Sequence, residues 1–230
     1  MAEFSDAYQT IRGNARAQFV EQRSRFLSFA FHVTDTDQVK DCMAALQKEY
    51  YDARHICYAY MLGPDRTEFR ANDNGEPSGT AGKPILGQIN SAGLTDILIA
   101  VVRYFGGVKL GTSGLIEAYR LGAQMAIQES ETVTCHVQQD LKVFFNFGMM
   151  NEMMKIVKDL EMTIVSQEYG VFEGPDPKGG GENLLFECCM VLRNRMSAVE
   201  SAKEKLNKMI EPMPDPEISF EPDCQDVTRI

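Results

Sequence analysis

The chain has 230 residues, of which 44% are hydrophobic and 24% are charged. This composition is typical of a soluble globular protein and excludes a fibrous, collagen-like or wholly disordered chain. A net charge of −10 argues against coating of nucleic acid by bulk charge, because that affinity comes mainly from Lys and Arg on phosphates.

The first part of the chain alternates between strand and helix patterns. Residues 25–33 are rich in Phe and β-formers, and residues 96–105 are apolar enough to lie centrally in a sheet. Asp35 or Thr36 supplies an N-cap for a helix that runs to Tyr51. The other expected elements are a strand at 55–62, a turn at Asn74-Gly75, a short helix at 84–91, a glycine-rich loop at 106–113 and a helix at 115–127.

The second part has a different rhythm, which indicates a second domain. We expect strands at 141–147, 162–172, 184–192 and 217–220, with helices at 151–160 and 197–209. The order β-α-β-β-α-β is the ferredoxin-like pattern. The sequence therefore predicts an α+β protein with domains at residues 1–136 and 137–230. Residues 174–181, which include GPDPKGGG, are interpreted as a flexible hairpin tip rather than a phosphate loop.

Several features place the protein in a cytoplasm. No apolar run approaches the roughly 18 residues that a membrane helix needs. The acidic start has no apolar run behind it, so we expect no signal peptide. The six cysteines show neither a disulfide framework nor metal-ligand spacing, which indicates reduced thiols. We expect no metal and no cofactor.

Two glycine-dense segments and one histidine carry the chemistry that the residues indicate. Residues 71–84 read ANDNGEPSGTAGKP, in which the glycines, with Ser78 and Thr80, are expected to leave amide N–H groups free for an anion. Residues 103–114 read RYFGGVKLGTSG, a strand running into a glycine loop and then a helix. Nine of the 12 arginines fall within residues 1–135, so a phosphate-recognising surface is expected there.

The candidate residues follow from these segments. The candidates for binding an anion or RNA are Arg54, His55, Lys83, Arg103, Gly106, Gly107, Lys109, Gly111, Thr112 and Ser113, and the acidic candidates are Asp73 and Glu76. Each has a simpler interpretation, since glycines also serve turns and packing, a lone His is often structural, and acids near turns are often solvated. Neither a Walker loop nor a GxGxxG fingerprint is present, and no catalytic residues are recognisable. The residues alone indicate a polar, glycine-lined surface that suits an anion.

Four motifs carry a resemblance to a known family. RSRF (23–26), HICYAY (55–60), NDNGEPSGTAGKPIL (72–86) and VVRYFGGVKLGTSGLIEAY (101–119) together resemble the IMPACT/YigZ family over residues 10–130. The rest resembles the small C-terminal domain of bacterial, YigZ-type members. Asn74 stands where the family usually has a second Asp, and Ser113 where it usually has Gly. Asn74 therefore weakens the case for a metal-binding pair of Asp residues.

The resemblance implies an N-terminal domain like the second domain of ribosomal protein S5. It implies a C-terminal domain like the last, ferredoxin-like domain of elongation factor G. The leading hypothesis is thus a non-enzymatic, translation-associated protein that binds the ribosome or structured RNA. One alternative is an enzyme or small-molecule binder that holds a phosphate ligand on the loop at 106–114. A second alternative is a protein–protein adaptor with a protein partner. No membrane contact is expected, and the oligomeric state is left open.

Overall fold

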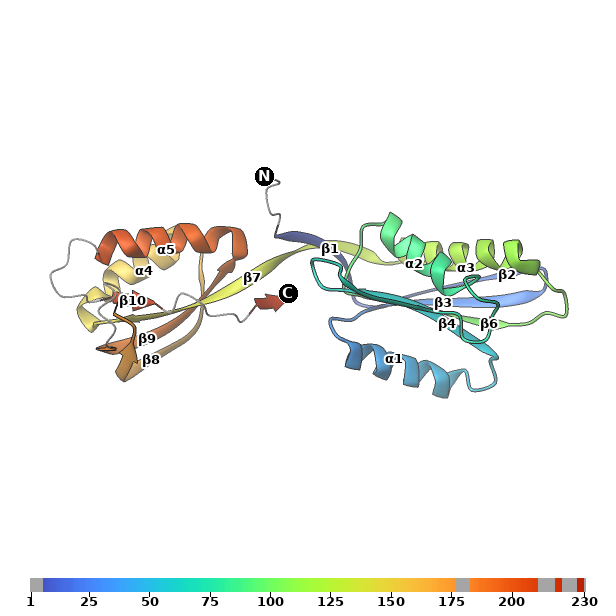
Figure 1. Ribbon diagram of the computed structural model, residues 1–230, viewed down its shortest axis with the longest axis horizontal. Helices are drawn as coiled ribbons and strands as arrows, with labels where there is room; N and C mark the ends of the chain where they lie inside the picture. The colour runs from blue at the N-terminus through green and yellow to red at the C-terminus, as the bar shows by residue number, and fades with distance from the viewer. Residues whose placement is uncertain (1–5, 177–182, 211–217, 221–226, 230) are drawn as a thin grey trace. The chain divides into compact units, whose positions relative to one another are not determined.

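The computed structural model describes residues 6–176, 183–210, 218–220 and 227–229. The chain divides into two compact units (Figure 1). The N-terminal unit spans residues 7–135, and the C-terminal unit comprises the chain from residue 136 onward together with Asp6. Both are mixed α/β structures whose sheets are built mainly from antiparallel strand pairs. No helix in these described ranges is long and apolar enough to span a membrane.

The N-terminal unit is built on a five-stranded sheet in the order β2-β3-β6-β4-β5. The strands of this sheet are β2 (Ala15–Glu21), β3 (Ser24–His32), β4 (His55–Leu62), β5 (Glu68–Asn72) and β6 (Ile97–Tyr104). Strand β1 (Ala7–Arg12) lies outside it and pairs with β7 (Glu131–Phe145). The helices are α1 (Thr36–Glu49), α2 (Gly82–Ser91) and α3 (Gly111–Gln128). Helix α1 covers one face of the sheet, and α2 and α3 cover the other (Figure 1).

The central strand β6 explains why both faces are covered. Its side chains alternate, so that Ile97 and Ile99 pack with α2 and α3, while Leu98 and Ala100 pack with α1. All four are fully buried, as a strand between two helical layers requires. The predicted central position of residues 96–105 is confirmed. Arg103, the residue before the end of the strand, is the only charged residue of β6.

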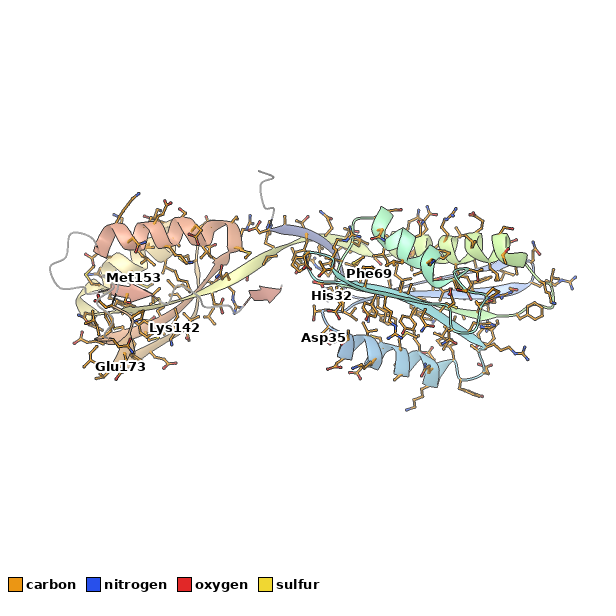
Figure 2. All side chains as sticks on the ribbon, viewed as in Figure 1. His32, Asp35, Phe69, Lys142, Met153 and Glu173 are labelled. Atoms are coloured by element: carbon orange, nitrogen blue, oxygen red, sulfur yellow. The ribbon has the colours of Figure 1, made fainter. Side chains whose placement is uncertain are left out.

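The C-terminal unit has the predicted order of elements. Strand β7 is followed by a 3-10 turn (Phe147–Met149), α4 (Met150–Asp159), β8 (Thr163–Gly174), β9 (Leu184–Arg195), α5 (Met196–Ile210) and β10 (Ile218–Phe220). The strands lie in the order β10-β7-β9-β8, and β11 (Val227–Arg229) also pairs with β7. Leu141 and Val143 of β7 pack against Met153 of α4 and Leu206 of α5, so both helices cover one face of the sheet (Figure 2 labels Met153).

Several boundaries differ from those predicted. Strand β7 begins at Glu131, ten residues before the expected 141. Its first half alternates Val133, Cys135 and Val137 with polar residues, a weaker pattern than the apolar run that follows. Strands β1 and β2 were missed likewise, because their few apolar residues are interspersed with polar ones. Helix α3 begins at Gly111 instead of 115. Most of the predicted hairpin tip at 174–181 lies outside the described residues, as does residue 217 of the last strand.

Candidate functional site

The segment between β5 and α2 is organised by one carboxylate. Oδ2 of Asp73 accepts the N–H of Gly79 at 2.8 Å, and Oδ1 accepts those of Ala81 at 3.0 Å and Gly82 at 2.8 Å. Burial of the carboxylate raises its pKa, but these three hydrogen bonds and the charge of Lys83 outweigh that effect, so the pKa of Asp73 is lowered. Asp73 therefore caps the start of α2.

The expectation that this segment leaves its amide groups free for an anion is wrong. Three of them are bound by Asp73, and the N–H of Thr80 donates to the Pro77 carbonyl at 3.0 Å. The predicted turn at Asn74-Gly75 is confirmed. Both residues have positive φ, 42° and 82°, and the N–H of Glu76 closes the turn onto the Asp73 carbonyl at 2.9 Å. This is a type I′ turn, which favours Asn followed by Gly.

Glu76 and Arg103 form a buried ion pair. Nη1 of Arg103 lies 2.6 Å from Oε1 of Glu76, and their side chains are 7% and 4% exposed. The Tyr119 hydroxyl donates to the same oxygen at 2.9 Å. The register of β6 places Arg103 between His55 on β4 and Phe26 on β3. The charge of Arg103 is thus neutralised inside the protein, in contrast to the exposed cation that the sequence suggested.

Sequence reasoning missed two residues that complete this network. Sγ of Cys57 lies 2.9 Å from the Asp73 carbonyl oxygen and 3.3 Å from Oη of Tyr119. Burial raises the pKa of the Cys57 thiol to about 12, so it stays protonated. Cys57 lies two positions after His55 on β4, on the same face of the strand. The alternation of side chains along a strand could therefore have indicated Cys57, whereas nothing local in the sequence connects Tyr119 to Glu76.

The second glycine segment, residues 106–110, is held differently. A Cβ on Gly106 would lie 2.0 Å from the backbone of Arg23, and its N–H donates to Oγ of Ser24 at 3.3 Å. Gly107 and Gly111 have φ of 90° and 72°. The contacts of Gly106 hold the start of the loop against the turn between β2 and β3, while residues 107–109 are exposed.

Helix α3 begins without a cap. The side chain of its N-cap residue, Leu110, makes no capping hydrogen bond, and no described side chain has a recorded bond to the first turn, where Gly111, Thr112 and Ser113 are exposed. The first N–H groups of a helix have no partner within it, and they carry the positive end of its dipole. The start of α3 is therefore suited to an anion, as the sequence predicted for this loop.

A cleft of about 390 Å³ lies in front of this helix start. It is lined by Arg54, His55, Glu76, Pro77, Arg103, Phe105, Lys109, Leu110, Gly111, Thr112 and Leu115. Seven of the predicted residues are thereby brought together, whereas Lys83, Gly106, Gly107, Ser113 and Asp73 do not line the cleft.

The cleft carries uncompensated positive charge. Arg54 and Lys109 are exposed, and neither makes an ion pair with any residue that the structure describes. Nδ1 of His55 lies 2.8 Å from the Asn74 carbonyl oxygen. Because a carbonyl only accepts, Nδ1 carries the hydrogen, and Nε2 of the neutral ring is an acceptor. Across the described ranges, no three His, Cys, Asp or Glu side chains are grouped so as to hold a metal ion.

These features define a class of protein, a two-unit α/β chain with a cationic cleft on its N-terminal unit. The model of the Impact N-terminal domain family matches residues 22–127, which include every residue of the cleft. An IMPACT family member of Haemophilus influenzae is 32% identical over 150 residues, which cover 64% of this chain and 73% of that protein. The chain belongs to the IMPACT family.

Two further relatives are similar over a shorter part of the chain. The IMPACT family member YigZ of Escherichia coli is 39% identical over 113 residues, covering 48% of this chain and 55% of the relative. YvyE of Bacillus subtilis is 38% identical over 113 residues, covering 49% and 52%. The chain thus aligns with about half the length of these two. A crystal structure of a hypothetical protein has a similar fold, with a TM-score of 0.66 and 23% identity over 96% of this chain and all of the other.

Proposed function

We propose that this chain is a non-enzymatic protein of the cytoplasm that binds the ribosome or structured RNA and thereby regulates translation. The observation that carries the proposal is the uncapped start of α3, which lies beside the unpaired cations Arg54 and Lys109 in one cleft. Amide groups at a helix start and basic side chains are the groups with which proteins contact nucleic-acid phosphates.

The two units add support at the level of the fold. The resemblance in sequence points to the second domain of ribosomal protein S5 for the first unit. For the second, it points to the last domain of elongation factor G, and the order β10-β7-β9-β8 fits a ferredoxin-like domain. Both domain types belong to translation. Fold analogy is a weaker argument than a site, so the cleft remains the main support.

The net charge of −10 limits the form that binding takes. Residues 136–230 hold 10 basic and 17 acidic residues, whereas residues 1–135 hold 13 and 16. The N-terminal unit is therefore the one that contacts RNA, while the acidic unit faces away from it or contacts ribosomal protein. Binding through a few local cations predicts an affinity that falls with salt.

Sedimentation with ribosomes through a sucrose cushion at low and moderate salt tests the proposal. The double variant Arg54→Ala/Lys109→Ala removes both unpaired cations, and we expect it to stay in the supernatant while the wild type sediments. Lys48→Ala/Arg70→Ala, which removes two exposed cations outside the cleft, is the matched control. Arg103 is unsuitable as a probe because its removal breaks a buried ion pair. Equal sedimentation of both variants would remove the cleft from the interface.

A phosphate-bearing small molecule is the second candidate. The cleft volume of about 390 Å³ falls within the range of small-ligand sites, and His55 offers an acceptor in it. A ligand that binds the native state raises the melting temperature by mass action. A rise with magnesium and a nucleotide, together with protein that stays in the ribosome supernatant, would favour this candidate.

A further inference from the structure

One aromatic side chain in the cleft is about half exposed. Phe105 immediately follows β6, is 52% exposed and lines the cleft beside Lys109. With Pro77, Leu110 and Leu115 it gives the cleft apolar surface next to its cationic groups. Phosphate recognition requires no aromatic surface, so this side of the cleft is suited to another part of the ligand.

The ring of Phe105 is supported from within the protein. The guanidinium carbon of Arg103 lies 5.7 Å from its ring centre, within the range of a cation–π contact. Arg103 is itself fixed by Glu76 at 2.6 Å. An aromatic ring held in this way is a rigid platform, which binds a planar group with little loss of conformational freedom.

The floor of the cleft also contains an unused donor. Nε of Arg103 is buried and has no hydrogen-bond partner among the residues that the structure describes. The same side chain is only 7% exposed. Buried donors are normally paired, so this group fits an internal bound water beneath the cleft.

We propose that the cleft accommodates one unpaired nucleotide, whose base stacks on Phe105 and whose phosphate lies at Arg54, Lys109 and the first turn of α3. Stacking on aromatic rings requires bases that are splayed out of a helix, as in single strands, loops and ends of RNA. This inference rests on the proposed function and narrows it from RNA in general to single-stranded segments. Free nucleotides share the same chemistry, so the test must separate the two sources.

Fluorescence anisotropy with a labelled oligouridylate tests the stacking. We expect Phe105→Ala to weaken binding about tenfold or more, since stacking on one aromatic side chain is typically of that size. Phe105→Trp should retain or improve it. Phe69→Ala is the matched control, because Phe69 is 57% exposed on β5, outside the cleft, and is labelled in Figure 2. Melting curves establish that each variant is folded.

Four results separate this inference from the proposed function. The same oligouridylate annealed to its complement should bind more weakly, and equal affinity would overturn the stacking while leaving RNA binding intact. Retained affinity in Phe105→Ala, with loss in Arg54→Ala/Lys109→Ala, would overturn it in the same way. If UMP competes at concentrations similar to those of the oligouridylate, the cleft is still a nucleotide site, but its ligand is a free nucleotide and not RNA. Binding of ribosomes without any oligouridylate binding would overturn this inference alone.

Discussion

The two glycine-rich segments of the N-terminal unit have similar compositions and opposite uses. Each precedes a helix, residues 73–81 before α2 and residues 106–110 before α3. In the first, Asp73 accepts three amide N–H groups, and Pro84 in the first turn of α2 has none to offer. In the second, no carboxylate of the described residues caps the helix, and its first residues are exposed.

The difference teaches that glycine content does not identify an anion site. What decides is whether the chain supplies its own acceptor for the amide groups it releases. The segment with Asp73 and Glu76 is tied to α2, β6 and α3, and it serves as a support. The segment before α3 is anchored at Gly106 and open beyond it, so it is the part that can receive a ligand.

The largest expected effect is loss of the buried ion pair. Glu76→Ala leaves the Arg103 guanidinium buried without a carboxylate, and we expect it to lower the free energy of unfolding by about 3–5 kcal/mol. Glu117→Ala is the control, since its pair with Arg120 is 66% and 48% exposed and is expected to contribute less than about 1 kcal/mol. Urea denaturation measures both. Similar losses in the two variants would contradict the supporting role of Glu76.

Substitutions at two glycines distinguish the anchored start of the second segment from its exposed part. Gly106→Ala places a Cβ 2.0 Å from the Arg23 backbone, which has to move, and we expect a loss of about 3 kcal/mol. Gly107→Ala meets no atom within 4 Å, and its cost of about 1 kcal/mol comes from the positive φ. If both substitutions cost the same in thermal denaturation, the loop is not anchored at Gly106.

The smallest expected effect concerns the Asp73 cap on α2, which is tested by the pH dependence of the free energy of unfolding. The lowered pKa of Asp73 means that its stabilisation is complete above the unfolded-state pKa of about 3.9 and is lost as pH falls through the lower folded-state value. We expect Asp73→Asn to cost about 1–2 kcal/mol at neutral pH, with the difference from wild type shrinking below about pH 4. Unfolding measured at both pH values checks this. A difference independent of pH would mean that the carboxylate charge plays no part.

Where hydrophobic periodicity was strong, the sequence was enough to predict the structure. The β-α-β-β-α-β order was found in this way, β6 was found from its continuous apolar run, and Asn74-Gly75 marked its turn because few other residues adopt positive φ. The early strands β1 and β2 and the first half of β7 were missed, because their few apolar residues are interspersed with polar ones and give a weaker pattern.

The candidate site was predicted in outline and not in its internal chemistry. The motifs supplied seven of the residues that line the cleft. Arg103 was expected to be available to a ligand, because a charge is rarely buried unless it is paired. Its partner Glu76 lies 27 positions earlier, and only the antiparallel pairing of β4 with β6 brings the two segments together. Such a pairing cannot be read from local spacing.

The buried pair of Glu76 and Arg103 also restricts how this cleft can evolve or be redesigned. The ion pair at the floor of the cleft stabilises the N-terminal unit, so substitutions there lower the free energy of unfolding before they alter ligand preference. Arg54, Lys109 and Phe105 at the rim are exposed, so substitutions there are expected to affect stability less. An engineered change of specificity is therefore best directed to those three positions.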